Sequence, residues 1–340
     1  LLPIAMKPLI CIPMGDPAGI GPEILATTAC DSTVYKTARL VGIGDRRVLQ
    51  RAAQAMGVAP CLHDVGLALD DLRDDGLNFV DLANADPNAF EVGKPGPVNG
   101  RAAYEYVAAA AKLALAGKVD AVAPTCLNKE ALHMAHVPYI GHTEILAGIA
   151  GVKNPLTMFQ VRLLRVFFLT RHLSLKKACE AVTKDHLLTF IFQCSDALKT
   201  LGIAEPRLFV AGLNPHCSDN GLFGTEERDA ITPAVLAARQ AGCDVQGPFP
   251  ADSVFHRALV NKSCDAVISL YHDQGHIATK MVDFERTISV TLGLPFLRTS
   301  VDHGTAYDIA GKGVASPVSL LEAVRLAALY APFFKHSHKA

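Results

Sequence analysis

The stretch CDAVISLYHDQGH, residues 264–276, joins an apolar run to a tight cluster of polar side chains. Residues 264–270 have the length and composition of a buried strand. The strand then ends in two histidines, an aspartate and a glutamine around a glycine. In open α/β sheets, ligands bind in the crevice at the carboxyl ends of the strands. The stretch therefore predicts a strand with a candidate ligand-binding turn, whose partners would lie at the ends of other strands.

Apolar runs of this kind alternate with segments of helical period along the chain. The strand candidates are LICIPM (9–14), ARLVGIG (38–44), DAVAPT (120–125), LRVFFLT (164–170), RLFVAGL (207–213) and DAVISLY (265–271). Helices are expected over residues 100–117, 174–200 and 225–241, and one opens after Asp45 as its cap. This alternation predicts an α/β fold with helices on both faces of the sheet. A late strand is expected within 285–295, with an antiparallel orientation left open.

Length and charge narrow the class of protein. A chain of 340 residues predicts two domains of about 150 residues each, and the 50% apolar content suffices for a sizeable core. Lys+Arg (32) and Asp+Glu (33) nearly balance, which argues against nucleic acid or an anionic membrane surface as a partner. No apolar run is long enough for a membrane span, and the start of the sequence lacks the features of a signal peptide. We therefore expect a cytoplasmic protein.

Nine cysteines are scattered along the chain without a CxxC pair. The CxxC pairs typical of zinc ribbons and of thioredoxin-like redox sites are therefore missing. We expect free thiols in a reducing compartment.

Three histidines occupy the same place relative to three predicted strands. His172 follows the strand at 164–170, His216 the strand at 207–213, and His272 the strand at 265–271. Three imidazoles from neighbouring strand ends can hold one divalent cation and leave a position for water or substrate. Each histidine could also simply bond within its own loop, and spacing alone leaves that alternative open.

Two turns carry a second kind of signal. MGDPAGIGPEI (14–24) is a glycine-rich strand-to-helix turn that does not fit GxGxxG, so a plain tight turn competes with an anion site at the helix start. GHTE (141–144) places His142 and Thr143 at a helix start. Thr143 is either an N-cap or, with His142, a donor in an anion or phosphate site.

Polar residues are unusually dense in the last third of the chain. Lys280 follows His272 by eight residues, and the segment 293–313 carries Arg298, Asp302 and His303. Cationic side chains near a metal would bind a carboxylate or phosphate. In GPFPADSVF (247–255), prolines restrict a loop that presents Asp252, which either caps a helix or faces a site.

Seven motifs together resemble the 4-hydroxythreonine-4-phosphate dehydrogenase family. They are MGDPAGIGPEI, LNKEAL, GHTE, NPHCSDNGLFGTEE, GPFPADSVF, YHDQGH and TLGLPFLRTSVDHGTAYDIAGKG, in the same order from Met14 to Gly313. The last motif is also similar to the loop of isopropylmalate dehydrogenases that holds the adenosine end of NAD. The resemblance implies an isopropylmalate dehydrogenase-like α/β fold of two α/β/α subdomains with a cleft between them. We expect the first over 6–135 plus 305–338, and the second, with the metal ligands and the dimer interface, over 136–304.

The resemblance also implies roles for individual residues. It gives His172, His216 and His272 as ligands of one divalent metal (Zn, Mg, Mn or Co). It assigns substrate binding to His142, Thr143, Lys280, Ser289 and Arg298, and NAD contacts to His303, Gly304 and Asp308. Asp252 corresponds to a residue supplied across the interface of a homodimer with a shared active site. Lys280 and Asp252 are the candidates for general base or proton donor.

Two departures from the family pattern leave the substrate open. Ser289 stands where an asparagine is expected, and Thr125–Cys126 precede LNKE in place of Ala-Pro. NGLFG and YHDQGHI are more similar to the subgroup that acts on D-threonate or D-erythronate 4-phosphate. A third relative acts on a dihydrodiol carboxylate. Lys280 and Arg298 can both bind a phosphate, which disfavours that unphosphorylated compound as the substrate. The sequence does not decide whether the substrate bears an amine or a hydroxyl, or whether the cofactor is NAD or NADP.

The expected reaction is a metal- and NAD-dependent oxidative decarboxylation of a 4-phosphorylated 3-hydroxy acid. Two alternatives come from other classes. A metal-dependent hydrolase could use the same three histidines with a metal-bound water, but it would not need the DIAGKG loop. A non-catalytic binding module for a metal or sugar acid would tolerate loss of Lys280.

Overall fold

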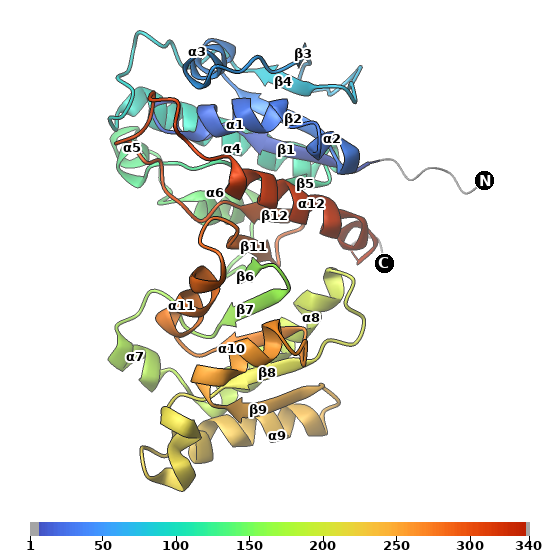
Figure 1. Cartoon of the computed structure of the whole chain (residues 1–340), viewed down its shortest axis with the longest axis vertical. Helices are drawn as coiled ribbons and strands as arrows, with labels where there is room; N and C mark the ends of the chain where they lie inside the picture. Colours follow the sequence, from blue (N-terminus) through green and yellow to red (C-terminus); the bar gives the residue numbers. More distant parts are fainter. Residues whose placement is uncertain (1–6, 338–340) are drawn as a thin grey trace, which may run out of the picture. The chain divides into compact units, whose positions relative to one another are not determined.

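The structure is a computed structural model and describes residues 7–337. Its contacts divide the chain into two compact units, shown in Figure 1 with the element labels used below. Unit 1 comprises Leu1–Pro155 with Gly293–Ala340, and unit 2 is Leu156–Leu292. The outermost residues of the predicted first subdomain, 6 and 338, lie outside the described residues.

Unit 1 is built on a parallel sheet in the order β3–β4–β2–β1–β5–β12. The strands are β1 (Leu9–Pro13), β2 (Arg39–Gly44), β3 (Leu62–Asp64), β4 (Leu77–Asp81), β5 (Ala121–Val122) and β12 (Leu297–Ser300). The strand β1 is fully buried, as expected for an apolar strand covered on both faces. Helices therefore have to cover both sides of this sheet.

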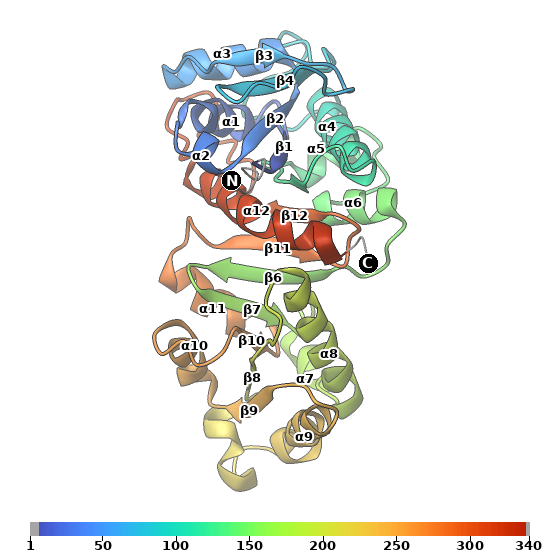
Figure 2. The same ribbon diagram turned by 90° about the vertical axis from the view of Figure 1, so that its right-hand side faces the viewer.

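Two groups of helices cover the sheet of unit 1, one on each face (Figure 2). One group is α4 (Pro97–Leu115), α5 (Lys129–Met134) and α6 (His142–Ala150), and the other is α1 (Gly21–Cys30), α2 (Val34–Thr37), α3 (Arg46–Met56) and α12 (Val318–Ser337). The alanines of α4 allow close packing, and a Cβ at Gly100 would lie 1.9 Å from the carbonyl oxygen of Ala131. As predicted, Asp45 caps α3 by accepting from the backbone N–H of Arg47.

Unit 2 contains a mixed sheet in the order β11–β6–β7–β10–β8–β9. Its strands are β6 (Leu156–Val161), β7 (Leu164–Phe168), β8 (Leu208–Ala211), β9 (Val245–Phe249), β10 (Ala266–Ser269) and β11 (Ile288–Leu292). β6 pairs antiparallel with β7 and β11, whereas β7, β10, β8 and β9 run parallel. The late strand within 285–295 is therefore antiparallel.

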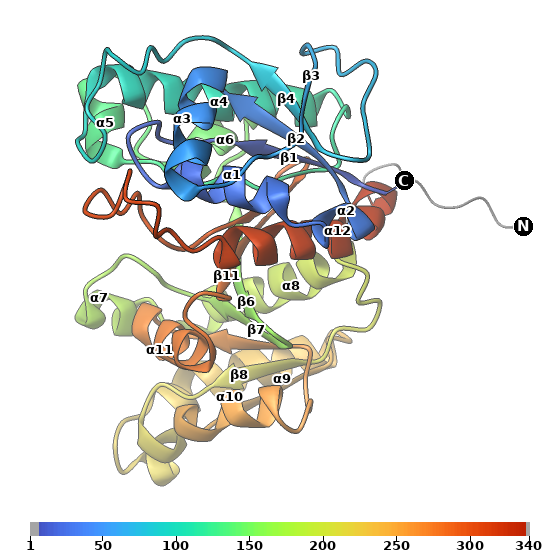
Figure 3. The ribbon, with the colours of Figure 1, turned by 45° about the horizontal axis from the view of Figure 1, so that its top comes forward.

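Helices also cover both faces of the sheet in unit 2. On one face, α10 (Ala251–Leu259) and α11 (His272–Val282) contact the central strands (Figure 3). On the other are α8 (Lys184–Thr200), α9 (Thr232–Gln240) and the π-helix η2 (Glu227–Ile231), while α7 (Leu175–Glu180) and the 3-10 segment η1 (Pro215–Gly221) lie in loops. Phe159, Phe168 and Val254 belong to the apolar core of this unit.

The α/β prediction is confirmed, with local differences. The helix expected over 174–200 is two helices, because Ser174 caps α7 and Thr183 caps α8. The strands β3, β4, β6 and β9 were not predicted. The contacts group residues 136–155 and 293–304 with unit 1, whereas the sequence placed them in the second subdomain, because α6 packs on α4 and β12 pairs with β5.

No helix within residues 7–337 is both long enough and apolar enough to cross a membrane. The nine cysteines are free thiols.

Candidate functional site

Two of the three predicted metal ligands lie next to each other in unit 2. His172 follows β7, and His272 is the first residue of α11, which follows β10. β7 and β10 are neighbouring parallel strands, so their carboxyl ends lie at the same edge of the sheet. The two imidazole rings are 5.9 Å apart between centroids. The predicted convergence of strand ends is therefore present for this pair.

A carboxylate orients the ring of His272. The Nδ1 atom of His272 lies 2.6 Å from the Oδ1 of Asp273. An ionised carboxylate can only accept, so Nδ1 carries the proton and Nε2 keeps its lone pair. A metal-binding histidine typically has such a partner, which fixes the tautomer and the ring. The donor chemistry of His272 thus fits a divalent cation.

His216 has the same kind of partner but stands in a separate loop. Its Nδ1 lies 3.2 Å from the Oδ2 of Asp219, and its side chain is 65% exposed. The backbone of residues 216–220 is left-handed throughout, which is unfavourable for non-glycine residues. Among the described residues, no three His, Cys, Asp or Glu side chains form a group that could hold a metal. The structure thus pairs His172 with His272 and leaves His216 apart from them.

Glu227 fixes the backbone just before His216. Its carboxylate accepts from the backbone N–H groups of Leu213 and Asn214 and from the side-chain amide of Asn214. Burial opposes ionisation of Glu227, but the hydrogen bonds from Asn214 and Leu213 outweigh it, so its pKa is lowered. The loop of His216 therefore has one firmly anchored end.

The face of α11 that begins at His272 continues with two more polar residues. His276 and Lys280 follow at intervals of four residues and so lie on the same side of the helix. The rings of His272 and His276 are 4.1 Å apart. Burial, followed by the charges of His272 and Lys280, lowers the pKa of His276 to about 4. We call His172, His272 and His276 the histidine cluster.

Ser289 lies on the sheet face that α11 covers. It pairs with Phe159 across the antiparallel strands β11 and β6, so the two side chains point to the same face. The ring of Phe159 in turn contacts His276, 4.4 Å away between centroids. Ser289 is buried, with 8% exposure. The structure thus brings Ser289 to the part of unit 2 that holds the histidine cluster.

Asp252 lies at the start of α10, beside a groove between α10 and α11. The groove has a volume of about 350 Å³ and includes Gln274 and Ile277 of α11 in its lining. After burial, the charges of Glu227, Asp252 and Asp219 contribute to raising the pKa of Cys217 to about 11. Asp252 therefore also faces the loop that carries His216.

In unit 1, three predicted substrate-binding residues do come together. Arg298 of β12 is only 5% exposed, and its Nη1 donates to the hydroxyl of Thr143 over 3.4 Å. His142 is the first residue of α6, and its Nε2 is buried without a hydrogen-bond partner. The N-cap of α6 is Gly141, and no side chain caps the helix, so Thr143 is not an N-cap. We call Arg298, Thr143 and His142 the anion seat.

The charge states of the anion seat follow from burial. Burial lowers the pKa of Arg298 to about 10, against the opposing charges of Glu144 and Asp302, so the guanidinium stays charged near neutral pH. Burial and the charge of Arg298 hold the pKa of His142 well below 6.5, so its imidazole is neutral. The seat offers one positive charge, one hydroxyl and one neutral imidazole at a helix N-terminus. That combination suits a phosphate or a carboxylate.

The predicted cofactor loop is anchored by a buried aspartate. Asp16 accepts hydrogen bonds from the hydroxyl of Tyr307 (2.6 Å), the amide of Asn99 (2.9 Å) and the backbone of Ala18 (2.8 Å). Burial still raises the pKa of Asp16. Within the loop, His303 is half-buried and its Nδ1 contacts the carbonyl of Gly304, while Asp308 is exposed. The three predicted cofactor contacts thus belong to one loop whose position depends on Tyr307.

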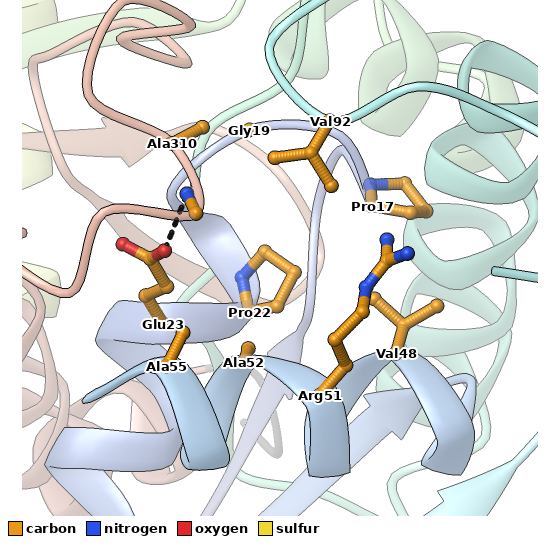
Figure 4. A pocket seen from close by; sticks show the side chains of 11 residues that line it. Pro17, Gly19, Pro22, Glu23, Val48, Arg51, Ala52, Ala55, Val92 and Ala310 are labelled. Atoms are coloured by element: carbon orange, nitrogen blue, oxygen red, sulfur yellow. Dashed lines mark hydrogen bonds between the residues drawn. The ribbon is translucent and has the colours of Figure 1, made fainter. Parts of the chain in front are cut away.

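A second anchor holds the end of the same loop. Glu23 of α1 is 2% exposed and accepts from the backbone N–H of Gly311 over 2.6 Å. Figure 4 shows this bond at the edge of a pocket of about 340 Å³ that α1, α3 and residues 310–311 line. Gly313 has a φ of 68°, and a Cβ there would lie 2.3 Å from the carbonyl oxygen of Ala55. The glycine-rich turn at 14–24 therefore acts in part as a support for the cofactor loop.

Sequence reasoning missed several of these residues. No role was predicted for His276, although its position four residues after His272 already put both on one helix face. The carboxylates of Asp273 and Asp219 were also overlooked, although each lies within three residues of a predicted ligand. Asp16 and Glu23 carried no readable signal, because their partners are about 290 residues away in the chain.

Comparison with known proteins adds independent information. Residues 36–327 match the family model described as pyridoxal phosphate biosynthetic protein PdxA. A protein of Fusobacterium nucleatum with the provisional name D-threonate 4-phosphate dehydrogenase is 53% identical over 332 residues, which is 97% of this chain and 99% of that protein.

Solved structures of similar proteins agree with the fold. The 4-hydroxythreonine-4-phosphate dehydrogenase of Klebsiella pneumoniae has a TM-score of 0.87 at 37% identity and covers 96% of this chain and 99% of its own. The corresponding enzyme of Burkholderia phymatum has a TM-score of 0.83 at 40% identity, covering 95% and 98%. The predicted isopropylmalate dehydrogenase-like fold is thereby confirmed.

Proposed function

This chain belongs to the family of the pyridoxal phosphate biosynthetic protein PdxA and is a dehydrogenase acting on a CH–OH group, and on that premise we propose that it oxidises a 4-phosphorylated hydroxy acid. The observation that carries the substrate class is the anion seat. A buried, charged Arg298 donates to Thr143 beside the neutral His142. A guanidinium in such a setting binds the oxygens of a phosphate or carboxylate with two directed donors.

Within this class, the substrate is D-threonate or D-erythronate 4-phosphate, with 4-hydroxythreonine 4-phosphate as the alternative. The relative that is 53% identical bears the name of a D-threonate 4-phosphate dehydrogenase. Ser289 supports the same choice, because it offers a single short hydroxyl where an asparagine would offer an amide. The products would be dihydroxyacetone phosphate and CO₂, or 3-amino-2-oxopropyl phosphate and CO₂ from the amine-bearing compound.

Membership of a dehydrogenase family implies a nicotinamide cofactor, and we assign NAD to the loop of His303, Gly304 and Asp308. When bound, the nicotinamide supplies the hydride acceptor. The exposed Asp308 is a carboxylate that can accept from ribose hydroxyls, whereas a phosphate on that ribose would meet its negative charge. Asp16 and Glu23 would keep the loop in place through Tyr307 and Gly311.

A divalent metal would be held by His172, His272 and His216. The first two are adjacent, and Asp273 and Asp219 each orient one ring so that Nε2 can bind. When bound, the metal supplies a Lewis acid for the substrate hydroxyl and for the carbonyl formed from it. Zn, Mg, Mn and Co all stay candidates, although three imidazoles favour a transition metal or Zn over Mg.

Lys280 and Asp252 are the proposed proton carriers. Lys280 lies on the cluster-bearing face of α11, with its Nζ 4.9 Å from the centroid of the Phe284 ring. Its ammonium group can also bind an anionic group of the substrate. Asp252 lines the α10–α11 groove and can accept a proton.

The active form is proposed to be a homodimer in which Asp252 serves the partner's site. The α11 helix exposes Ile277 (63%) and Met281 (81%) four residues apart, and Phe284 (66%) is exposed just after the helix ends. Ile277 also lines the groove that contains Asp252. Exposed apolar side chains grouped in this way mark association surfaces. A second copy of this chain is the proposed occupant.

The test is NADH formation by the purified protein with a divalent metal and each of the three phosphorylated acids in turn. Turnover of D-threonate or D-erythronate 4-phosphate supports the proposal as stated. Turnover of 4-hydroxythreonine 4-phosphate alone keeps the dehydrogenase and replaces the substrate. Formation of NADH from none of them contradicts the proposal. No observation favours the metal-dependent hydrolase, since the similar proteins are named dehydrogenases.

A further inference from the structure

We propose that His276 is a specificity-determining residue, which donates a hydrogen bond to the C2 hydroxyl of the substrate and so selects hydroxyl-bearing over amine-bearing acids. The inference rests on the proposed function, because it names the residue that recognises the C2 substituent, the group by which the candidate substrates differ. It deepens that proposal by tying the choice of substrate to a single nitrogen atom.

The position of His276 is fixed by aromatic packing. Its ring stacks on Phe168 with centroids 4.5 Å apart and makes a T-shaped contact with Phe159 at 4.4 Å between centroids. His272 lies on a third side at 4.1 Å. A side chain held on three sides presents its remaining edge in one direction, which is what discrimination between similar ligands requires. Because His272 is a proposed metal ligand, that edge would lie near the C3 hydroxyl that the metal would bind, and so near the substituent on the neighbouring C2.

The proton of His276 is assigned by its surroundings. The Nδ1 atom is buried and has no hydrogen-bond partner. A buried N–H without an acceptor is costlier than a buried lone pair, so Nε2 rather than Nδ1 carries the ring proton. His276 therefore offers a ligand a donor, Nε2–H.

A donor at this place separates the two substrate types. A hydroxyl oxygen has lone pairs and accepts the bond, whereas the ammonium group of an amino acid has only donors. A site that forms a hydrogen bond with one substrate and leaves its own polar group unpaired with the other discriminates strongly. Ser289 supports this assignment, because it is paired with Phe159 and so lies on the same face as the His276 ring.

The test compares kcat/KM for D-threonate 4-phosphate and 4-hydroxythreonine 4-phosphate in three variants. His276→Phe keeps an aromatic ring against Phe168 but removes Nε2–H. It should lose roughly tenfold in kcat/KM for the hydroxyl substrate, the size of one hydrogen bond, with little loss for the amine substrate. His276→Gln retains an N–H donor and should restore part of the preference. Phe159→Leu disturbs the same packing without removing a donor and should affect both substrates alike.

A binding measurement separates recognition from chemistry. Calorimetric titration of both substrates into the metal-loaded protein without NAD should show the same change of preference in His276→Phe, with metal affinity unchanged. Equal losses for the two substrates in that variant would overturn the inference, and so would a wild-type protein that prefers the amine substrate. If wild type turns over neither compound, it is the proposed function that fails, which is a different outcome.

Discussion

The anion seat of unit 1 and the histidine cluster of unit 2 are built in opposite ways. In the seat, Arg298 comes from the buried strand β12 and meets the first turn of α6, and its guanidinium is almost completely buried. In the cluster, His172 and His272 stand on the ends of neighbouring strands, and the side chain of His272 is 42% exposed. The seat is complete without a ligand, whereas the cluster brings His172 and His272 together while His216, the third proposed metal ligand, stands on a separate exposed loop.

The difference separates binding from chemistry. A buried cation fixed by the fold binds an anion at little cost in ordering, so the seat should determine mainly affinity. Imidazoles at strand ends gain their full arrangement from the cation that they bind, so the cluster should determine mainly the rate. Mutations in the two regions should therefore change different kinetic parameters.

His272→Ala should produce the largest effect. Loss of one imidazole removes both a ligand and the geometry of the others, so kcat should fall by at least about 1000-fold and metal affinity with it. Metal content by equilibrium dialysis is measured beside turnover. His186→Ala, which removes a histidine bonded to Ala181 in another part of unit 2, serves as the control. Normal turnover and metal content in His272→Ala would remove this residue from the site.

Asp252→Asn tests whether the cluster is completed by a partner. Each of Asp252→Asn and His272→Ala should be almost inactive alone. If Asp252 serves the partner's site, co-expressed mixtures contain dimers with one intact site, and activity should return to about a quarter of wild type, the limit set by random pairing. Activity that stays absent in the mixtures, with mixed dimers present, would place Asp252 within its own chain's site or outside catalysis.

Arg298→Ala tests the seat. Truncating one partner of a buried charged contact typically costs 2–5 kcal/mol, so KM for the phosphorylated acid should rise about 30-fold or more, with a smaller change in kcat. Arg298→Lys keeps the charge but loses the planar guanidinium, so its KM should lie between those of wild type and Arg298→Ala. Arg325→Ala, which removes an arginine paired with Glu322 on α12, is the matched control. A fall in kcat with KM unchanged would contradict the expectation that the anion seat determines affinity and the histidine cluster the rate.

Ser289→Asn should have a smaller effect. If position 289 helps to read the C2 substituent, the asparagine should shift the ratio of kcat/KM toward 4-hydroxythreonine 4-phosphate by a few-fold to tenfold. The ratio is measured with both substrates present in competition. An unchanged ratio would leave the choice of substrate to other residues, and melting temperature serves to exclude a folding defect.

The stability of unit 1 should depend on His142. Because burial and Arg298 hold its folded pKa well below 6.5, the folded state resists the proton that the unfolded chain accepts. Stability from this group is complete above pH 6.5 and declines as the pH falls below it, by at most about 1.4 kcal/mol per pH unit. Urea denaturation of His142→Gln between pH 7 and 5 should show a shallower decline than wild type. An identical decline would contradict the burial argument.

Whether a feature of the fold or the site could be predicted depended on how far apart its contacting residues lie along the chain. The strand before His272 and the strand before His172 were predictable, because an apolar run followed by a polar turn is a local pattern. Their adjacency followed from the rule that strand ends share an edge. The pairing of Arg298 with Thr143 did not follow from any pattern, because it joins residues 155 positions apart.

Other features were beyond sequence reasoning for physical reasons. The left-handed run at 216–220 breaks the usual preference of non-glycine residues, so no propensity signals it. The boundary between the units depends on where α6 and β12 pack, which the order of elements does not determine. The roles given to the metal, cofactor and proton-carrying residues stay predictions.

The most direct test of the proposed reaction measures the release of CO₂ and the formation of NADH in the same incubation. D-threonate 4-phosphate with carbon-13 in its carboxylate is incubated with the protein, NAD and a divalent metal, and labelled CO₂ and NADH are measured over time. We expect the two to appear in equal amounts and neither to appear when the metal is removed. NADH without labelled CO₂ would contradict the decarboxylation, and the absence of both with every candidate metal would contradict the proposed reaction.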